Sequence, residues 1–300
     1  MSAAAGKGTG LGSRWVSYGF LLPFLFFFIL FWVAPLAGGL KLSIQSNEIY
    51  GQSRFVGLDN FHALMKDPVF FKALRNTLVY TAISIGIILP LALGLAHLLR
   101  ATFSRLRPAL TFCLLLPALT PPAVLALLFL LVFHGRQGML NQWFVLPFGF
   151  APVDWLKDPK VILWALVLQA VWRWTGFVTF FILAGMEAIP RAYYEAVQLA
   201  TGSRWQWFRY VTFPQLRHVL LFGAVYLMVD AFSLFSGAYV LLGASGGTSN
   251  AGLLLVSYVY QLGFHPNLQF GTAAAASLSV APLLLLALGL CFVLPRHRAE

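Results

Sequence analysis

Two ionisable residues stand inside long apolar stretches of this sequence, where charged side chains are rare. Arg173 interrupts the apolar run at residues 161–185, and Asp230 lies in another that opens near Val219. A charge in such a run is costly unless it is paired or lines a water-filled space. Two interpretations follow: the charges line a path for a polar solute, or they pair structurally, within this chain or with a second subunit. Aromatic residues accompany both charges: Trp172, Trp174, Phe232, Phe235 and Tyr239.

The segment at residues 187–217 is the second place where the residue pattern predicts a specific structure. Pro190 suits the first position of a helix because its missing N–H costs nothing there. Residues 191–200 are mostly good helix formers and predict a first short helix. After a Thr-Gly break, Ser203 can cap a second short helix that runs through Phe208. The pattern predicts two short helices at a sharp angle.

Pro214 is expected to open the next apolar span directly after these helices. Aromatic and basic side chains crowd the segment: Arg191, Arg204, Trp205, Trp207, Phe208, Arg209, Tyr210 and Arg217. An amphipathic hairpin resting at a lipid interface would have this composition. A docking element for a cytoplasmic partner would have it too, because an angled helix pair with aromatic anchors and arginines fits a partner groove.

The remaining reactive residue types show no spacing that would support catalysis or metal binding. The six histidines are scattered, no HExxH or GxSxG motif occurs, and Cys113 and Cys291 both fall in apolar stretches. The N-terminal AAAGKGTG lacks the first glycine of a phosphate-binding loop. No paired carboxylates or His–carboxylate cluster stand together. The sequence therefore predicts no catalytic residue, no metal site and no cofactor of its own.

The elements that must position these residues are membrane helices. Only 29 of 300 residues are charged, 60% are apolar and the mean hydropathy is +0.81, which excludes a disordered chain and a typical soluble enzyme. We predict an all-α polytopic membrane protein with six transmembrane helices. The apolar runs that carry them are 15–40, 76–99, 108–135, 161–185, the run from Val219, and 270–294, with a Gly/Ser turn at 243–252 before the last.

The distribution of Lys and Arg predicts that both termini are cytoplasmic. With that orientation, eleven basic residues lie inside and eight outside. Most of the net charge of +11 is thus topological, and no basic stretch favours nucleic-acid binding. The predicted organisation is a cytoplasmic tail at 1–14, a first transmembrane helix at 15–42 that is retained rather than cleaved, an extracytoplasmic segment at 43–73, a five-helix core at 74–295 that contains the loop 187–217, and a cytoplasmic tail at 296–300.

The patterned loop resembles the EAA loop of binding-protein-dependent ABC import permeases. The resemblance rests on Glu195-Ala196-Val197, on Gly202, and on Phe208, Val211 and Phe213-Pro214. Three positions depart from the usual form: Val197 replaces the second Ala, Ala200 replaces a common Asp, and Thr201 occupies the usual Gly position, with Gly202 one residue later.

Further segments resemble the sugar and glycerol-phosphate branch of that family, in the same order along most of the chain. They are FVGLDNF at 55–61, LRNTL at 74–78, Leu116-Pro117 with Pro121-Pro122, VDWL at 153–156, and LAGMEAIP at 183–190. The resemblance implies a type I ABC importer permease architecture with a MetI-like fold, in the plasma membrane.

The resemblance also implies partners and site residues. The partners are a second permease subunit, two cytoplasmic ATPase subunits that bind ATP and Mg²⁺, an extracytoplasmic solute-binding protein, and membrane lipid. The implied ATPase-coupling loop comprises Glu195, Ala196, Gly202, Ser203, Arg204, Trp205, Phe208 and Pro214. The candidate translocation path for a carbohydrate or polyol comprises Arg173, Asp230, Phe232, Phe235 and Tyr239. A six-helix secondary transporter or channel subunit driven by an ion gradient is the alternative function.

Overall fold

The structure is a computed structural model of the chain, and it describes residues 11–46, 54–102, 105–200, 203–264 and 268–293. These residues are nearly all helical and contain no strand, only an isolated bridge between Gln45 and Phe55. The α-helices are α1 (Leu11–Phe28), α2 (Ala34–Ser43), α3 (Asp59–Lys66), α4 (Pro68–Ala101), α5 (Arg107–Leu119), α6 (Pro122–Val132), α7 (Ile162–Glu187), α8 (Arg191–Ala200), α9 (Arg204–Trp207), α10 (Phe213–Phe232), α11 (Ser236–Leu242), α12 (Leu255–Phe264) and α13 (Phe270–Val293).

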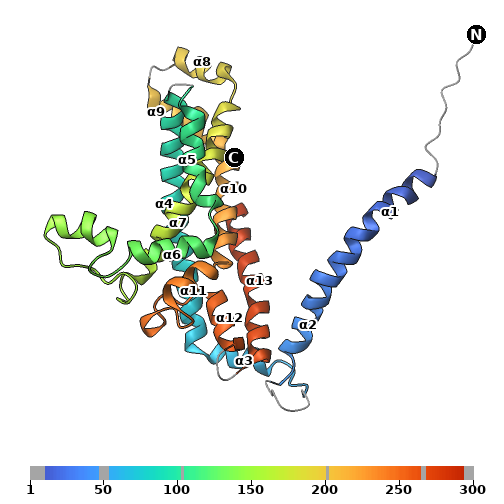
Figure 1. Cartoon of the computed structure of the whole chain (residues 1–300). Helices are drawn as coiled ribbons and strands as arrows, with labels where there is room; N and C mark the ends of the chain where they lie inside the picture. The colour runs from blue at the N-terminus through green and yellow to red at the C-terminus, as the bar shows by residue number, and fades with distance from the viewer. Residues whose placement is uncertain (1–10, 47–53, 103–104, 201–202, 265–267, 294–300) are drawn as a thin grey trace, which may run out of the picture.

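The long helices α4, α7 and α10 form the centre of an elongated bundle, with α5 alongside them and α13 lying lower beside α10 (Figure 1). Small residues allow the helices to approach closely, as in other membrane bundles. Ala92 of α4 is fully buried, and its carbonyl oxygen accepts a hydrogen bond from Thr179 of α7 at 3.4 Å. Gly176 of α7 lies directly against the backbone of Leu114 in α5. The helices that carry Arg173 and Asp230 are therefore held in a tightly packed frame.

The structure contains five or six candidate spans, so the predicted number of six is the upper end of that range. Five helices in the described residues are long and apolar enough to cross a membrane: Gly19–Ser43, Pro68–Ala101, Ile162–Glu187, Trp205–Phe232 and Phe270–Gly289. The run predicted as one span at 108–135 consists of α5 and α6, which meet at 97° and count as a sixth span only if taken together.

The bend between α5 and α6 has a local cause. Pro121 and Pro122 have no N–H to donate, and a residue that precedes proline is disfavoured in the α conformation. Thr120 and Pro121 are accordingly extended, with ψ of 131° and 136°. A charge-free run is thus insufficient to predict a straight helix when it contains two consecutive prolines.

Three π-helical turns each end two residues before a proline: η1 (Ile29–Val33), η2 (Asn141–Val145) and η4 (Phe208–Thr212). A proline inside a helix clashes with the carbonyl four residues earlier and cannot bond to it. A wider turn relieves that conflict without ending the helix. The prolines at 35 and 214 therefore stand within continuous helical segments.

The prediction that Pro214 opens a new span after a separate short helix is wrong for this reason. Helix α9, the π-turn η4 and α10 form one continuous element, and the apolar span begins at Trp205. This span ends at Phe232, and two further short helices, α11 and α12, follow before α13. The Gly/Ser turn predicted at 243–252 connects α11 to α12, with positive φ at Gly243, Gly246 and Gly247.

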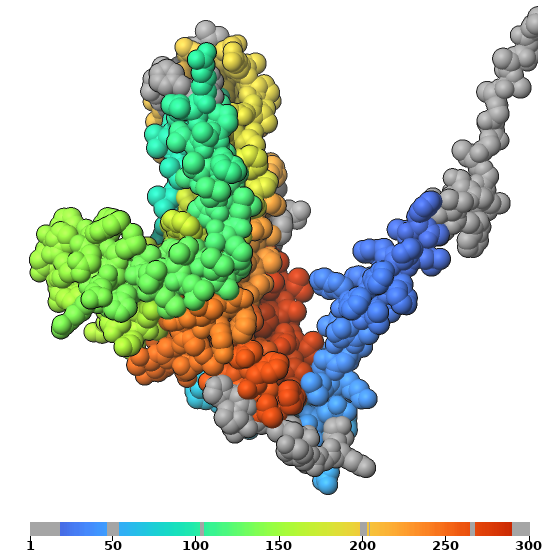
Figure 2. Space-filling view, in the orientation of Figure 1, coloured from blue at the N-terminus to red at the C-terminus, as the bar shows by residue number. Residues whose placement is uncertain are grey.

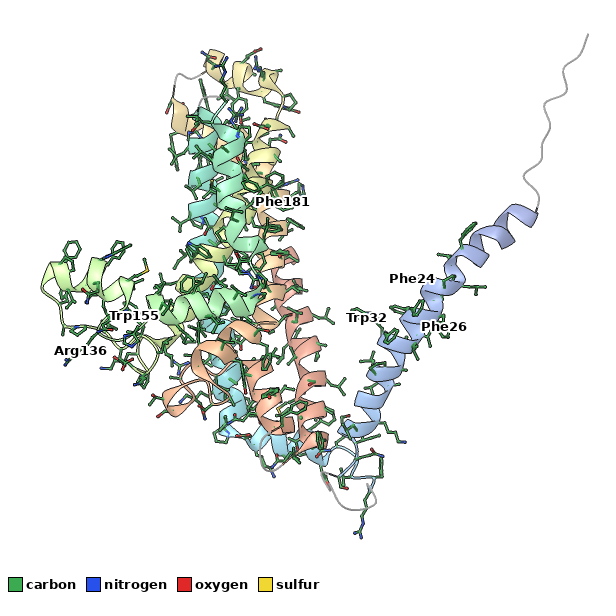
Figure 3. All side chains as sticks on the ribbon, viewed as in Figure 1. Phe24, Phe26, Trp32, Arg136, Trp155 and Phe181 are labelled. Atoms are coloured by element: carbon green, nitrogen blue, oxygen red, sulfur yellow. The ribbon has the colours of Figure 1, made fainter. Side chains whose placement is uncertain are left out.

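Helix α1 stands apart from the bundle, whereas α2 approaches it and packs against α13 (Figures 1 and 2). Large side chains such as Phe24, Phe26 and Trp32 project outward from the segment that α1 begins, and Trp32 is 72% exposed (Figure 3). A lobe formed by residues 134–160 projects from the opposite side (Figure 2). Its fully buried centre is Asn141, which bonds the backbone of Gly135 and Val153 and accepts from the Trp155 indole at 3.2 Å.

Candidate functional site

A small polar pocket lies where α4, α6, α7, α10 and α11 meet, and both predicted intramembrane charges line it. Its lining residues are Tyr80, Pro122, Leu125, Gln169, Ala170, Arg173, Trp174, Asp230, Leu234 and Gly237. The space inside has room for about one water molecule. Arg173 and Asp230 are each half-buried, on α7 and α10. The structure therefore brings together two charges that are 57 positions apart in the sequence.

Trp174 connects these two charges, which form no ion pair with each other in the described part of the chain. Its indole Nε1 donates to Asp230 Oδ2 at 2.7 Å, and the Arg173 guanidinium carbon lies 4.5 Å from its ring centroid. Hydrogen bonds to a carboxylate and a cation over an aromatic face are both favourable where water is scarce. The indole thus stabilises both charges at once.

Gln169 is a pocket residue that the sequence reasoning missed. It is only 5% exposed, and its Nε2 has no hydrogen-bond partner in the described structure, as is also true of Arg173 Nε. Its Oε1 faces Gly237, where an added Cβ would lie 3.1 Å away. A buried donor without a partner is costly. One polar residue one helical turn before Arg173 in an apolar run was the available signal.

The aromatic residues predicted beside Asp230 divide into two groups. Phe232 is 3% exposed and belongs to an apolar cluster with Phe70 and Tyr258, so the structure does not bring it to the pocket. Phe235 and Tyr239 instead form an aromatic cluster with Tyr260 of α12, with ring centroids 5.0–5.2 Å apart. Leu234 and Gly237, their neighbours in the sequence, line the pocket, whereas Phe235 and Tyr239 are not among its lining residues.

The segment predicted as a coupling loop lies at one end of the bundle, where α8 and α9 sit beyond the end of α5 (Figure 1). Glu195 and Ala196 are exposed on α8, and Trp205 is 65% exposed and stacks on Phe208 with ring centroids 5.6 Å apart. Ser203 is exposed, and Pro214 stands in the first turn of α10. Gly202 lies outside the described residues, and of Arg204 only the backbone is described.

A groove of about 520 Å³ runs beneath α8, between it and the end of α4. It is lined by His97, Arg100, Ala101, Arg191, Tyr194, Glu195, Gln198, Trp207, Phe208 and Thr212. The exposed face of α8 and the groove behind it give this end of the molecule a shaped surface that carries charged and aromatic groups.

Among the described residues, no group of three or more His, Cys, Asp or Glu is placed to hold a metal ion. The described architecture combines five or six apolar spans, a polar pocket at their crossing and a patterned helical surface at one end. These features are those of a multi-pass membrane protein with a polar site inside its helical bundle.

The chain belongs to the family described as "Binding-protein-dependent transport system inner membrane component", which it matches over residues 86–298. It is therefore a multi-pass inner-membrane permease subunit of an ABC transport system. It is 33% identical over 258 residues to the arabinooligosaccharides transport system permease protein AraP of Bacillus subtilis (strain 168), covering 86% of this chain and 81% of that one. It is 30% identical over 281 residues to the lactose transport system permease protein LacF of Rhizobium radiobacter, covering 93% of each.

A solved structure with the same fold is a bacterial ABC transporter involved in the import of the acidic polysaccharide alginate. The TM-score is 0.81 at 22% identity, with 97% of this chain and 98% of that chain covered. The predicted permease fold is thereby confirmed, while the orientation of the termini stays a prediction.

Proposed function

We propose that this protein is a permease subunit of an ATP-driven ABC importer for a carbohydrate or related polyol. The observation that carries the proposal is the match, across 81–93% of their length, to permeases named for arabinooligosaccharide, lactose and trehalose/maltose transport. The polar groups at the crossing of the spans and the exposed surface of α8 support the proposal, since they are suited to a path for a hydroxylated solute and to a contact with an energy-supplying partner.

In this proposal, the translocation path passes the pocket between α7 and α10. Arg173, Asp230 and Gln169 offer charged and amide groups to solute hydroxyls, while Phe235 and Tyr239 offer ring faces. A pocket with room for about one water is far too small for a sugar ring, so this conformation is closed. Helices α7, α10 and α11 must separate to admit solute, and solute hydroxyls then satisfy the unpartnered donors of Gln169 and Arg173.

The coupling part of the proposal assigns α8 to a cleft in a cytoplasmic ATPase subunit. Glu195 orients the helix or meets a basic group there, and Trp205 and Phe208 provide apolar contacts. ATP and Mg²⁺ are bound by the ATPase subunits. A second permease subunit completes the path, and an extracytoplasmic binding protein delivers solute. This assignment requires the end carrying α8 to be cytoplasmic, in agreement with the predicted cytoplasmic termini.

The energy source separates this proposal from a secondary transporter. The permease and its partner subunits are reconstituted in liposomes with the ATPase sites facing the medium. The binding protein and radiolabelled lactose, maltose or arabinooligosaccharides are enclosed in the liposome lumen, and release of the label into the medium is followed. Transport that requires added ATP and survives a protonophore supports the importer. Transport that does not require ATP and stops when the ion gradient is dissipated would overturn the importer proposal in favour of a secondary transporter or channel.

The path assignment is tested by Asp230→Asn, with Asp154→Asn on the exposed lobe as the matched control. We expect Asp230→Asn to lower transport while the complex still assembles and the control behaves like wild type. Loss of the assembled complex would instead assign Asp230 a structural role in binding Trp174.

A further inference from the structure

Arg100, in the last turn of α4, makes two contacts with one residue of α8. Its Nη1 donates to the Tyr194 hydroxyl at 3.0 Å, and its guanidinium carbon lies 5.0 Å from the centroid of the Tyr194 ring. Both side chains are half-buried at the groove beneath α8. A planar guanidinium suits this combination of hydrogen bond and cation–π contact better than a lysine would.

The Tyr194 hydroxyl continues the contact to a third element. It lies 3.2 Å from Thr212 Oγ1, which is 6% exposed at the end of the π-turn η4. Because Arg100 can only donate, the Tyr194 hydroxyl accepts from it. Between the Tyr194 and Thr212 hydroxyls either oxygen can be the donor, and Thr212 Oγ1 also lies 3.5 Å from the Trp207 carbonyl oxygen, to which it can donate. A chain of hydrogen bonds thus joins α4 to α8 and α8 to the helix that carries Asp230.

A second arginine contacts the end of α4 that carries Arg100. Arg107, the first residue of α5, donates through Nη1 to Glu187 Oε1 at 2.6 Å, where α7 ends. Its Nη2 donates to the Arg100 carbonyl at 3.0 Å. The side chains of Arg107 and Glu187 are 28% and 50% exposed, so the ion pair contributes little to stability by itself. Its position joins the ends of α4, α5 and α7 directly below α8.

We propose that Arg100 and Tyr194 are positioning residues that connect movement of α8 to α4 and α10. The inference rests on the proposed function, in which α8 contacts the ATPase. Neither residue needs to touch the ATPase or the solute. The phenol hydroxyl holds α8 at a fixed place relative to the two spans that line the pocket, Tyr80 being on α4 and Asp230 on α10. Without this hydroxyl, α8 can move with the ATPase while the spans remain in place.

The test compares Tyr194→Phe with Tyr193→Phe in the reconstituted transporter. Each substitution removes one hydroxyl from neighbouring positions on α8, but Tyr193 is 51% exposed and lies outside the bond chain. The readout is solute transported per ATP hydrolysed, measured on complexes whose subunit composition has been verified. We expect Tyr194→Phe to assemble and to lose about tenfold in this ratio, the effect of removing one hydrogen bond to a charged group. Tyr193→Phe should retain the wild-type ratio.

A double-mutant cycle isolates the bond itself. Because Arg100→Gln and Tyr194→Phe both remove the bond between the guanidinium and the Tyr194 hydroxyl, the loss in the double variant should be smaller than the sum of the two single losses. Additive losses, or a wild-type ratio in Tyr194→Phe, would overturn the inference, and so would failure of Tyr194→Phe to assemble, since that would make the hydroxyl a stability contact. Absence of ATP-driven transport in the wild-type complex would instead refute the proposed function, and the two failures are therefore distinguishable.

Discussion

Gly176 is the position where a single methyl group should disturb the bundle most. It lies in α7, three residues after Arg173, and faces α5. A Cβ added there would lie 1.7 Å from the Leu114 carbonyl oxygen and 2.4 Å from its carbonyl carbon. Both atoms are backbone, so no side chain can turn away. For the added Cβ to lie even 3.0 Å from this oxygen, α5 must move by about 1.3 Å relative to α7.

We expect Gly176→Ala to destabilise the folded protein by about 2 kcal/mol, the cost of overpacking a rigid contact. Gly94→Ala is the control, because Gly94 is inside α4 and an added Cβ there meets nothing within 4 Å. Alanine is the better helix former, so this variant should gain about 1 kcal/mol.

The assay is thermal unfolding of the purified protein in detergent, followed by the loss of helical circular dichroism. The apparent melting temperature of Gly176→Ala should lie about 5 °C below that of wild type. A melting temperature equal to or above that of Gly94→Ala would refute the close α5–α7 packing.

Two further substitutions test other parts of the fold. Asn141→Asp should destabilise the lobe by about 2 kcal/mol, because it removes the donor to two backbone carbonyls at a fully buried position, whereas Gln137→Glu on the exposed surface of the lobe should be near neutral; limited proteolysis of the lobe measures both. Burial and the hydrogen bond to Asp67 raise the pKa of the Tyr258 phenol, so the folded state holds this proton more tightly than the unfolded state. Stability should be constant up to about pH 10 and fall above it, and Tyr258→Phe should reduce that alkaline loss in pH-dependent melting curves.

Much of the fold follows from charge-free runs, since lipid excludes charges and each long run must become a helix. The helices at Gly19–Ser43 and Pro68–Ala101 could be predicted in this way, and Ile162–Glu187 could be predicted from an apolar run that Arg173 alone interrupts. The bend at Pro121 could not be predicted by counting charges, although the two adjacent prolines carried the information. The continuity of α9 with α10 depends on the π-turn η4, which ends two residues before Pro214 and which no charge count could predict.

The candidate site was less predictable because the residues that contact one another in it come from distant parts of the chain. Arg173 and Asp230 were conspicuous as charges in apolar runs, but the Trp174 indole that bonds Asp230 resembles any other aromatic residue in such a sequence. Arg100 looked like a topological charge in a short loop, and its contact with Tyr194 arises only when α4 and α8 are packed. Phe232 showed the opposite, an aromatic beside Asp230 that the fold places in the core.

Charge reversal at Glu195 tests most directly whether α8 couples this subunit to an ATPase, as we propose. The reconstituted importer is assayed for ATP-driven solute transport and for solute-stimulated ATP hydrolysis, with Asp154→Arg on the exposed lobe as the charge-reversal control. We expect Glu195→Arg to abolish both activities while the control retains them. Wild-type transport and stimulation in Glu195→Arg would contradict the coupling role of α8.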